Sequence, residues 1–484
     1  MKIIVNGFVN EILRSVIKDY INEANISKCY FVDTRIDPQN TDRITYLDFR
    51  DLSFAHYNVD WNELITPDKS LIENMYPCEV QVMKMMERIE QYTGRISYDE
   101  RRIIYYRHLR FWNHIIEKDE IDLFLSGNIP HEVYDFIIYH LCKLKNINTF
   151  FFHQTMPDFL MLMRDWNPFL IELKTSFENL QKKITDPDNL QLEKRSQNVL
   201  AKQLNSNIDS IPFYRTKDFI KEKRKRTVNR KRQRSLRKIT SVSFYARIFK
   251  RKNIRIFLYR LLGVRLQNIR SSNLTRLYNR LAIRPDLNRK FIYVPLHFQP
   301  ELTTNPLAEC FVDQKLIIDI LTKSVPEDIN IYIKENPIQK IWGRSMSYYK
   351  EINKIPNVYL VDSKTDTYDL INNSVAVATA TGTAGWESLF REKPVLIFGN
   401  IFYQYAKGVY KCSSVKDCQQ AMQQILPGKA KPDISSMKLY LRAMEQVTTP
   451  GYYTYYYQPG SELDPEENHR TILNSLLTKT LKRL

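Results

Sequence analysis

The chain has 484 residues, of which 43% are hydrophobic, and a formal net charge of +18 at pH 7. This length and composition predict a globular protein with two domains rather than one. The six scattered cysteines exclude a disulfide framework or a zinc site, and no run of about 18 uncharged apolar residues is present to span a membrane. Because the N-terminus also lacks a signal-peptide pattern, we expect the protein to stay in the cytoplasm.

The first 205 residues alternate between short apolar or aromatic runs and stretches with helical periodicity. Strands are predicted at residues 2–8, 28–34, 43–49, 121–127 and 149–154. Helices are predicted at residues 9–24, 79–92, 99–118 and 131–146. Strands that alternate with helices form a mainly parallel sheet covered on both faces, so residues 1–205 are predicted to be a Rossmann-like domain on the acceptor side.

A strongly basic segment follows. Residues 221–290 contain 24 Lys and Arg against only two acids, Glu222 and Asp286, so the rest of the chain is close to neutral. Residues 206–288 are therefore predicted to be a basic, mostly helical insertion. Such a segment suits an anionic membrane surface or the phosphates of a nucleic acid. Because no nucleic-acid reading motif is recognisable, we expect the membrane surface and consider nucleic acid an unlikely partner.

Strand and helix patterns alternate again from residue 289 to 425. Strands are predicted at residues 290–298, 330–337, 357–362, 374–380 and 394–399, and helices at 313–325, 347–355, 367–373 and 385–392. The fold class predicted is therefore α/β, with two Rossmann-like, doubly wound domains that face a cleft. Residues 426–484 are predicted to be a helical tail that returns to brace the first domain.

The chain has only 12 glycines, yet Gly382 and Gly385 lie in one short loop, TGTAG, between a predicted strand and helix. Glycines allow positive φ and a close approach to the backbone, and a helix N-terminus favours an anion. The loop formed by Thr381, Gly382, Thr383 and Gly385 is therefore a candidate phosphate site. A tight strand-to-helix turn without a ligand is the alternative.

Three spaced motifs carry a resemblance to a known family: YVPLHFQPELTTNP (293–306), YIKENP (332–337) and TGTAGWESLFREKPVLIFG (381–399). Together with PHEVYDFIIYHLCK and TFFFHQTMPDF in the first domain, they resemble capsular polysaccharide biosynthesis proteins, a family that includes Kdo transferases. The last motif is also similar to the nucleotide-binding end of GT-B glycosyltransferases and of UDP-sugar epimerases.

The resemblance implies a metal-independent GT-B-like transferase that needs no cofactor and takes a nucleotide-sugar as substrate. It implies that the Thr381–Gly385 loop holds the donor phosphate, that Glu387 binds ribose hydroxyls, and that Lys334 or Arg344 stabilises the departing nucleotide. Asn336 stands where the family commonly has a histidine before proline. An asparagine can donate a hydrogen bond there but carries no charge.

Further polar residues end predicted strands, where a cleft is expected. His297 and Gln299 close one strand and Glu301 follows, so they are candidates for a ligand-facing role, with a satisfied loop network as the alternative. In the corresponding place in the first domain, His131 and Glu132 are candidates for the base that deprotonates an acceptor hydroxyl. Capping of the following helix by Glu132, with an incidental His131, is the alternative.

We therefore expect a glycosyltransferase that moves a sugar from a nucleotide-activated donor, with CMP one candidate, to a capsular or other surface polysaccharide or a lipid-linked acceptor. A nucleotide-sugar epimerase or hydrolase on the same scaffold is the first alternative. A nucleic-acid-binding protein that uses the basic segment is the second.

Overall fold

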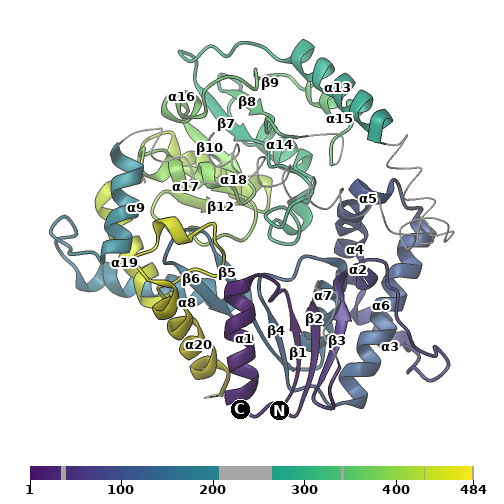
Figure 1. Cartoon of the computed structure of the whole chain (residues 1–484). Helices are drawn as coiled ribbons and strands as arrows, with labels where there is room; N and C mark the ends of the chain where they lie inside the picture. Colours follow the sequence, from purple (N-terminus) through teal and green to yellow (C-terminus); the bar gives the residue numbers. More distant parts are fainter. Residues whose placement is uncertain (34–39, 206–263, 340–342, 430, 482–484) are drawn as a thin grey trace, which may run out of the picture.

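The computed structural model describes residues 1–33, 40–205, 264–339, 343–429 and 431–481. Its two halves each contain a six-stranded sheet (Figure 1). Strand ranges predicted from the sequence are occupied by strands in both sheets. The greater part of the predicted basic insertion, residues 206–263, lies outside the described residues.

The sheet of the first half has the strand order β3-β2-β1-β4-β5-β6, and its strands are parallel except for β6, which pairs antiparallel with β5. The strands are β1 (Lys2–Asn6), β2 (Lys28–Asp33), β3 (Ile44–Asp48), β4 (Leu123–Ser126), β5 (Asn148–Gln154) and β6 (Leu160–Met163). The near-continuous apolar sequence of β1, β4 and β5 fits strands that are covered on both faces.

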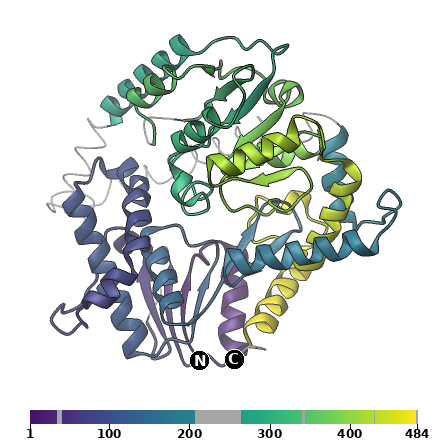
Figure 2. The ribbon, with the colours of Figure 1, turned by 180° about the vertical axis from the view of Figure 1, so that it is seen from behind.

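Helices cover this sheet on both faces (Figure 2). The helices of this half are α1 (Glu11–Glu23), α2 (Phe49–Leu52), α3 (Lys69–Asn74), α4 (Tyr76–Met85), α5 (Glu87–Thr93), α6 (Tyr98–Lys118), α7 (Val133–Leu144), α8 (Trp166–Lys183) and α9 (Lys194–Asn205). The long helix α6 begins at a capping box formed by Ser97 and Glu100. Its inner face buries Tyr105, His108, Leu109 and Trp112 against α4 and α7.

The second half has the strand order β12-β11-β10-β7-β8-β9, all parallel. The strands are β7 (Phe291–Pro295), β8 (Asn330–Lys334), β9 (Val358–Leu360), β10 (Ala376–Thr379), β11 (Val395–Ile397) and β12 (Val409–Lys411). The helices are α13 (Val264–Leu281), η3 (Glu309–Val312), α14 (Lys315–Thr322), α15 (Met346–Ile352), α16 (Thr367–Asn373), α17 (Thr383–Leu389) and α18 (Val415–Ile425). Helix α13 forms the end of the basic segment, and its Leu274 and Tyr278 pack into the core of this half.

The tail is helical and returns to the first half. It consists of α19 (Ile434–Val447), the short η4 (Gln458–Gly460) and α20 (Pro465–Leu481). Helix α20 packs beside α1, where the Tyr20 hydroxyl donates to Thr480 Oγ1 at 2.9 Å. Helix α19 packs on α8, and both chain termini lie at the base of the first half (Figures 1 and 2).

Candidate active site at two sheet switch points

The candidate residues lie mostly at one position in each sheet. Strands β1 and β4 are neighbours, yet the chain continues from them to opposite edges, and the same is true of β7 and β10. In open parallel sheets the crevice beyond the carboxyl ends of such a strand pair is where ligands bind. We call the crevice beyond β1 and β4 the first mouth and the crevice beyond β7 and β10 the second mouth.

His131 lies in the first mouth, on the loop between β4 and α7. Its Nδ1 is 2.6 Å from the carbonyl oxygen of Ile129. Since a carbonyl only accepts, Nδ1 carries the proton and Nε2 retains a lone pair. Burial lowers the pKa of His131, and the positive charge of Arg88 lowers it further. His131 is therefore a neutral imidazole whose Nε2 can accept a proton.

Glu132 stands at the N-cap position of α7, but its carboxylate is not used as a cap. Within the described residues the Glu132 side chain accepts no capping hydrogen bond, and its Oε1 lies 3.9 Å from Nε2 of His131. The capping interaction predicted as an alternative is therefore not formed. The carboxylate is placed instead to stabilise a positive charge on His131.

Asp135 holds this loop from below, a role that the sequence analysis missed. Its buried carboxyl accepts from Asn6 Nδ2 at 3.1 Å. Burial, and next the charge of Glu132, raise the pKa of Asp135 well above its usual range. The Tyr134 hydroxyl donates to Oδ1 of the same Asn6 at 2.8 Å. The loop is thus fixed on the end of β1.

His297 connects the two loops of the second mouth. Its Nε2 accepts from the Thr381 amide at 3.2 Å and lies 3.0 Å from Thr379 Oγ1, while Thr379 Oγ1 accepts from the Gly382 amide at 3.1 Å. Its lone pair is therefore engaged by the loop after β10. His297 therefore takes part in a loop network, and its predicted ligand-facing role stays a prediction.

The Thr381–Gly385 loop lies at the strand-to-helix turn as predicted. Gly382 has φ −78° and Gly385 lies inside α17, so neither residue uses the positive φ that glycine allows. A Cβ at Gly382 would lie 2.6 Å from Thr379 Oγ1, and one at Gly385 would lie 2.4 Å from the Tyr403 hydroxyl. The close approach that requires glycine is thus to side chains of the protein's own core.

Arg344 holds the loop after β7 from the other side. Its guanidinium donates to Glu335 Oε2 at 2.7 Å, to Gln299 Oε1 at 2.9 Å and to the His297 carbonyl at 2.9 Å. Both members of the Arg344–Glu335 ion pair are buried, with 1% and 6% of their side chains exposed. The buried network fixes Gln299 at the edge of the space between the halves, where Arg344 itself also lies.

Among three other residues predicted to bind the donor, Lys334 and Asn336 make hydrogen bonds within the protein, and their predicted donor contacts stay predictions. Lys334 Nζ donates to the Thr365 carbonyl and to Thr367 Oγ1 at 2.9 Å, and burial lowers its pKa. Asn336 Oδ1 accepts from the Ile338 amide at 3.2 Å and shapes a turn. Glu387 is 5% exposed and lies in the second turn of α17, not in the first turn as expected.

Arg88 on α5 joins the two mouths. One of its nitrogens donates to the His131 carbonyl, and Nη2 donates to the Asn305 carbonyl of the second half at 2.8 Å. Its charge also interacts with Glu132 and with Glu301. No sequence signal marked Arg88, because it lies in the middle of a predicted helix among other charged residues.

A chain of contacts runs on from Glu301 to the glycine loop. Glu301 Oε2 accepts from Thr303 Oγ1 at 3.0 Å, and the Thr303 carbonyl accepts from Thr381 Oγ1 at 2.5 Å. The candidate base, Arg88, Glu301 and the loop after β10 therefore form one continuous region between the halves.

A cavity of about 1650 Å³, here called the cleft, opens beside this region. It is lined by α4, α5 and α6 of the first half, by α13, and by residues after β7 including Gln299 and Asn305. Over the described ranges, no three His, Cys, Asp or Glu side chains converge as a metal site. The cleft is large enough for a nucleotide-sugar or an oligosaccharide.

Comparison with known proteins supports the family resemblance over part of the chain. The family model described as capsule polysaccharide biosynthesis protein matches residues 303–452, so the resemblance is confirmed there. The match includes the Thr381–Gly385 loop, Glu335, Arg344 and Tyr403, whereas His297 lies before its start. No curated protein matches the chain.

Solved structures of several sugar enzymes are similar at a low level. The UDP-GlcNAc 2-epimerase of Methanocaldococcus jannaschii has 10% identity and a TM-score of 0.28, covering 92% of this chain and 100% of its own. The β-Kdo 2,7 transferase KpsC of Thermosulfurimonas dismutans has 10% identity and a TM-score of 0.27, covering 91% and 99%. The lipopolysaccharide glycosyltransferase WaaG has 8% identity and a TM-score of 0.27, covering 98% and 99%. Scores of this size do not establish a common fold, so the architecture rests on the two sheets described above.

Proposed function

We propose that this protein is a glycosyltransferase that moves a sugar from a nucleotide-activated donor to a capsular or other surface polysaccharide acceptor. The observation that carries the proposal is the pair of hydrogen bonds made by Arg88. It bonds the carbonyl of the neutral His131 in the first mouth and the carbonyl of Asn305 in the loop after β7. The match of residues 303–452 to capsule polysaccharide biosynthesis proteins supports the same class of reaction.

In the proposed reaction, Nε2 of His131 accepts the proton of an acceptor hydroxyl. The acceptor oxygen bonds to the anomeric carbon of the donor sugar while the bond from that carbon to the phosphate oxygen breaks, and the nucleotide leaves with the bonding electrons. Glu132, 3.9 Å from Nε2, stabilises the imidazolium that forms. Nδ1 remains bonded to Ile129 throughout, which keeps the ring oriented.

The donor phosphate is proposed to lie against the loop from Thr381 to Gly385. The Thr381 and Gly382 amides already donate to His297 and Thr379, so the amide proposed to face the phosphate is that of Thr383, which is half-exposed at the start of α17. His297 and Thr379 fix the loop. No cofactor is proposed, and a metal-independent reaction remains part of the proposal.

The acceptor is proposed to be reached at the inner face of the cell membrane. None of the described helices is long and apolar enough to cross a bilayer. The basic segment, residues 221–290, is proposed to bind anionic lipid headgroups instead. Arg265 and Arg270 on α13 belong to its described part.

The test begins with a thermal-shift panel of CMP, UDP, GDP and their sugar conjugates on the purified protein. The nucleotide that raises the Tm identifies the donor class. Nucleotide release is then measured with and without polysaccharide acceptors. Release that depends on the acceptor supports a transferase. Release without any acceptor identifies a hydrolase, and conversion of the sugar without release identifies an epimerase.

A further inference from the structure

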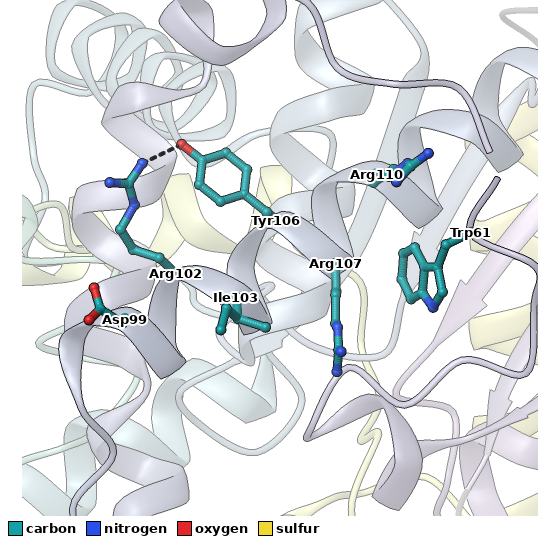
Figure 3. A pocket seen from close by; sticks show the side chains of 7 residues that line it. All are labelled: Trp61, Asp99, Arg102, Ile103, Tyr106, Arg107 and Arg110. Atoms are coloured by element: carbon teal, nitrogen blue, oxygen red, sulfur yellow. Dashed lines mark hydrogen bonds between the residues drawn. The ribbon is translucent and has the colours of Figure 1, made fainter.

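The outer face of α6 carries a groove of about 510 Å³, here called the α6 groove (Figure 3). Arg102, Tyr106 and Arg110 recur every four residues along the helix, and Arg107 lies in the neighbouring column. Trp61, in the loop between α2 and α3, forms the far wall. Three guanidinium groups therefore line one face over about 12 Å of helix.

The cations of the groove are only partly neutralised by the protein. Arg102 is paired with Glu79 at 3.5 Å and donates to the Tyr106 hydroxyl at 2.8 Å. In the described part of the chain no carboxylate forms an ion pair with Arg107 or Arg110, although Nη2 of Arg110 donates to the Leu64 carbonyl at 3.1 Å. Because Arg107 is exposed, its guanidinium can reach a ligand in the groove.

Aromatic and apolar surface is interleaved with these cations. The guanidinium of Arg107 lies 5.9 Å from the Trp61 ring, and that of Arg102 lies 5.2 Å from the Tyr106 ring. Ile103, between them, is 52% exposed. Guanidinium forks match carboxylates, and ring faces can pack against the C–H faces of sugars.

Among the described residues, the α6 groove and the cleft share no lining residue. Arg101 lines the cleft and the next residue, Arg102, lines the α6 groove, and consecutive helix positions point about 100° apart. The groove is therefore a separate site. Its ring faces at Trp61 and Tyr106, which can pack on sugars, favour a glycan over a lipid surface.

We propose that the α6 groove binds a carboxylate-bearing stretch of the acceptor polysaccharide, outside the site where its end reacts. The inference rests on the proposed function and adds the substrate class, an acidic glycan. Binding by exposed cations weakens with added salt.

The test measures direct binding of a polygalacturonate oligomer by calorimetry, with a neutral dextran oligomer and vesicles of anionic phospholipid as separate arms. Wild type is expected to bind polygalacturonate but not dextran, and Arg107→Gln is expected to weaken binding about five- to tenfold. Trp61→Ala is expected to weaken binding by a similar factor without changing the charge. Thermal unfolding of each variant verifies that it is folded.

The matched control is Arg164→Gln, because Arg164 is also exposed and stacked, with its guanidinium 5.7 Å from the Phe150 ring. It is expected to bind polygalacturonate as wild type does. Equal binding by wild type and Arg107→Gln would overturn the proposal, as would no binding by wild type. Loss of vesicle binding alone in Arg107→Gln would also overturn it and identify a membrane contact. Since binding is measured without a donor, failure here is distinct from absence of transferase activity.

Discussion

Nη2 of Arg88 donates a hydrogen bond to the carbonyl oxygen of Asn305, 2.8 Å away, and so connects the helix before α6 with the loop after β7. The same guanidinium bonds the His131 carbonyl and lowers the pKa of the His131 imidazole. Arg88 therefore connects the two halves and also contributes to the lowered pKa of the candidate base, His131.

Arg88→Gln is expected to shift the pH profile of kcat/KM. A nearby positive charge disfavours the imidazolium, so its removal raises the pKa of His131. The active form is the neutral imidazole, and the acid limb should therefore move to higher pH. Arg88→Lys keeps the charge and should leave the limb close to that of wild type. An unchanged limb in Arg88→Gln would show that the base is not His131.

Replacing the candidate base should affect turnover rather than donor binding. His131→Ala and Glu132→Gln are expected to lower kcat by about 10²–10⁴-fold while the donor Kd stays near that of wild type. His469→Ala, on α20 beside Asp19, is the control and should be fully active. If both variants keep wild-type turnover, Glu301 becomes the next candidate, because Nε2 of His297 is already engaged.

Gly385→Ala tests the reason for the glycine. The added Cβ would meet the Tyr403 hydroxyl, so we expect a loss of about 1–3 kcal/mol in the free energy of unfolding. Tyr403→Phe removes that oxygen, together with its hydrogen bond to the Gly382 carbonyl, at a cost of about 1 kcal/mol. The double variant should lose less than the sum of the two, as measured by urea unfolding. Strict additivity would mean that the clash lies elsewhere.

Acid should destabilise the fold through buried histidines. Burial lowers the pKa of His140 to about 4, and its ring packs 4.4 Å from that of Phe136. In the unfolded chain the pKa of His140 is near 6.5, so the protein gains the full stability from the neutral ring above that pH. As the pH falls toward 4, the free energy of unfolding decreases by about 3 kcal/mol in total.

His140→Phe is therefore expected to flatten the decline of unfolding free energy between pH 6.5 and 4.5 by up to about 1.4 kcal/mol per pH unit. Urea unfolding at several pH values measures this slope. A wild-type slope in His140→Phe would refute the assignment.

Membrane binding is expected to depend on the basic segment. Each Lys or Arg near an anionic leaflet contributes about 1 kcal/mol. Neutralising Arg224, Lys225, Arg226, Lys231 and Arg232, which lie outside the described residues, should release the protein from anionic vesicles in a sedimentation assay. Equal sedimentation of wild type and variant would end this proposal.

The sequence predicted the sheets well where strands are long and apolar. It missed β6, whose run Leu160–Met163 is only four residues long, and β12, which has three residues. Length alone is not the reason, since β9 and β11 also have three residues and were predicted. Strand β6 follows β5 without an intervening helix, and β12 lacks the buried apolar run of its neighbours. The location of His131 and of the glycine loop followed from one rule about parallel sheets, because both lie where a strand ends and a helix begins.

What the sequence could not provide were contacts between distant segments. The reason for Gly385 is Tyr403, a side chain from beyond the next strand, so local backbone chemistry suggested positive φ instead. Arg88 meets a backbone carbonyl of Asn305, which leaves no pattern in either segment. The occupied lone pair of His297 likewise depends on a loop more than 80 residues away.

The return of α20 to the first half has a consequence for synthesis on the ribosome. Ile472, Leu473 and Leu476 complete the core that contains Val16, Ile17 and Tyr20 of α1. The apolar surface of α1, near the start of the chain, is thus covered only after α20, near its end, has been synthesised. The first half cannot finish folding while the second half is being made, and a nascent chain that stops before residue 465 exposes that surface to chaperones and proteases.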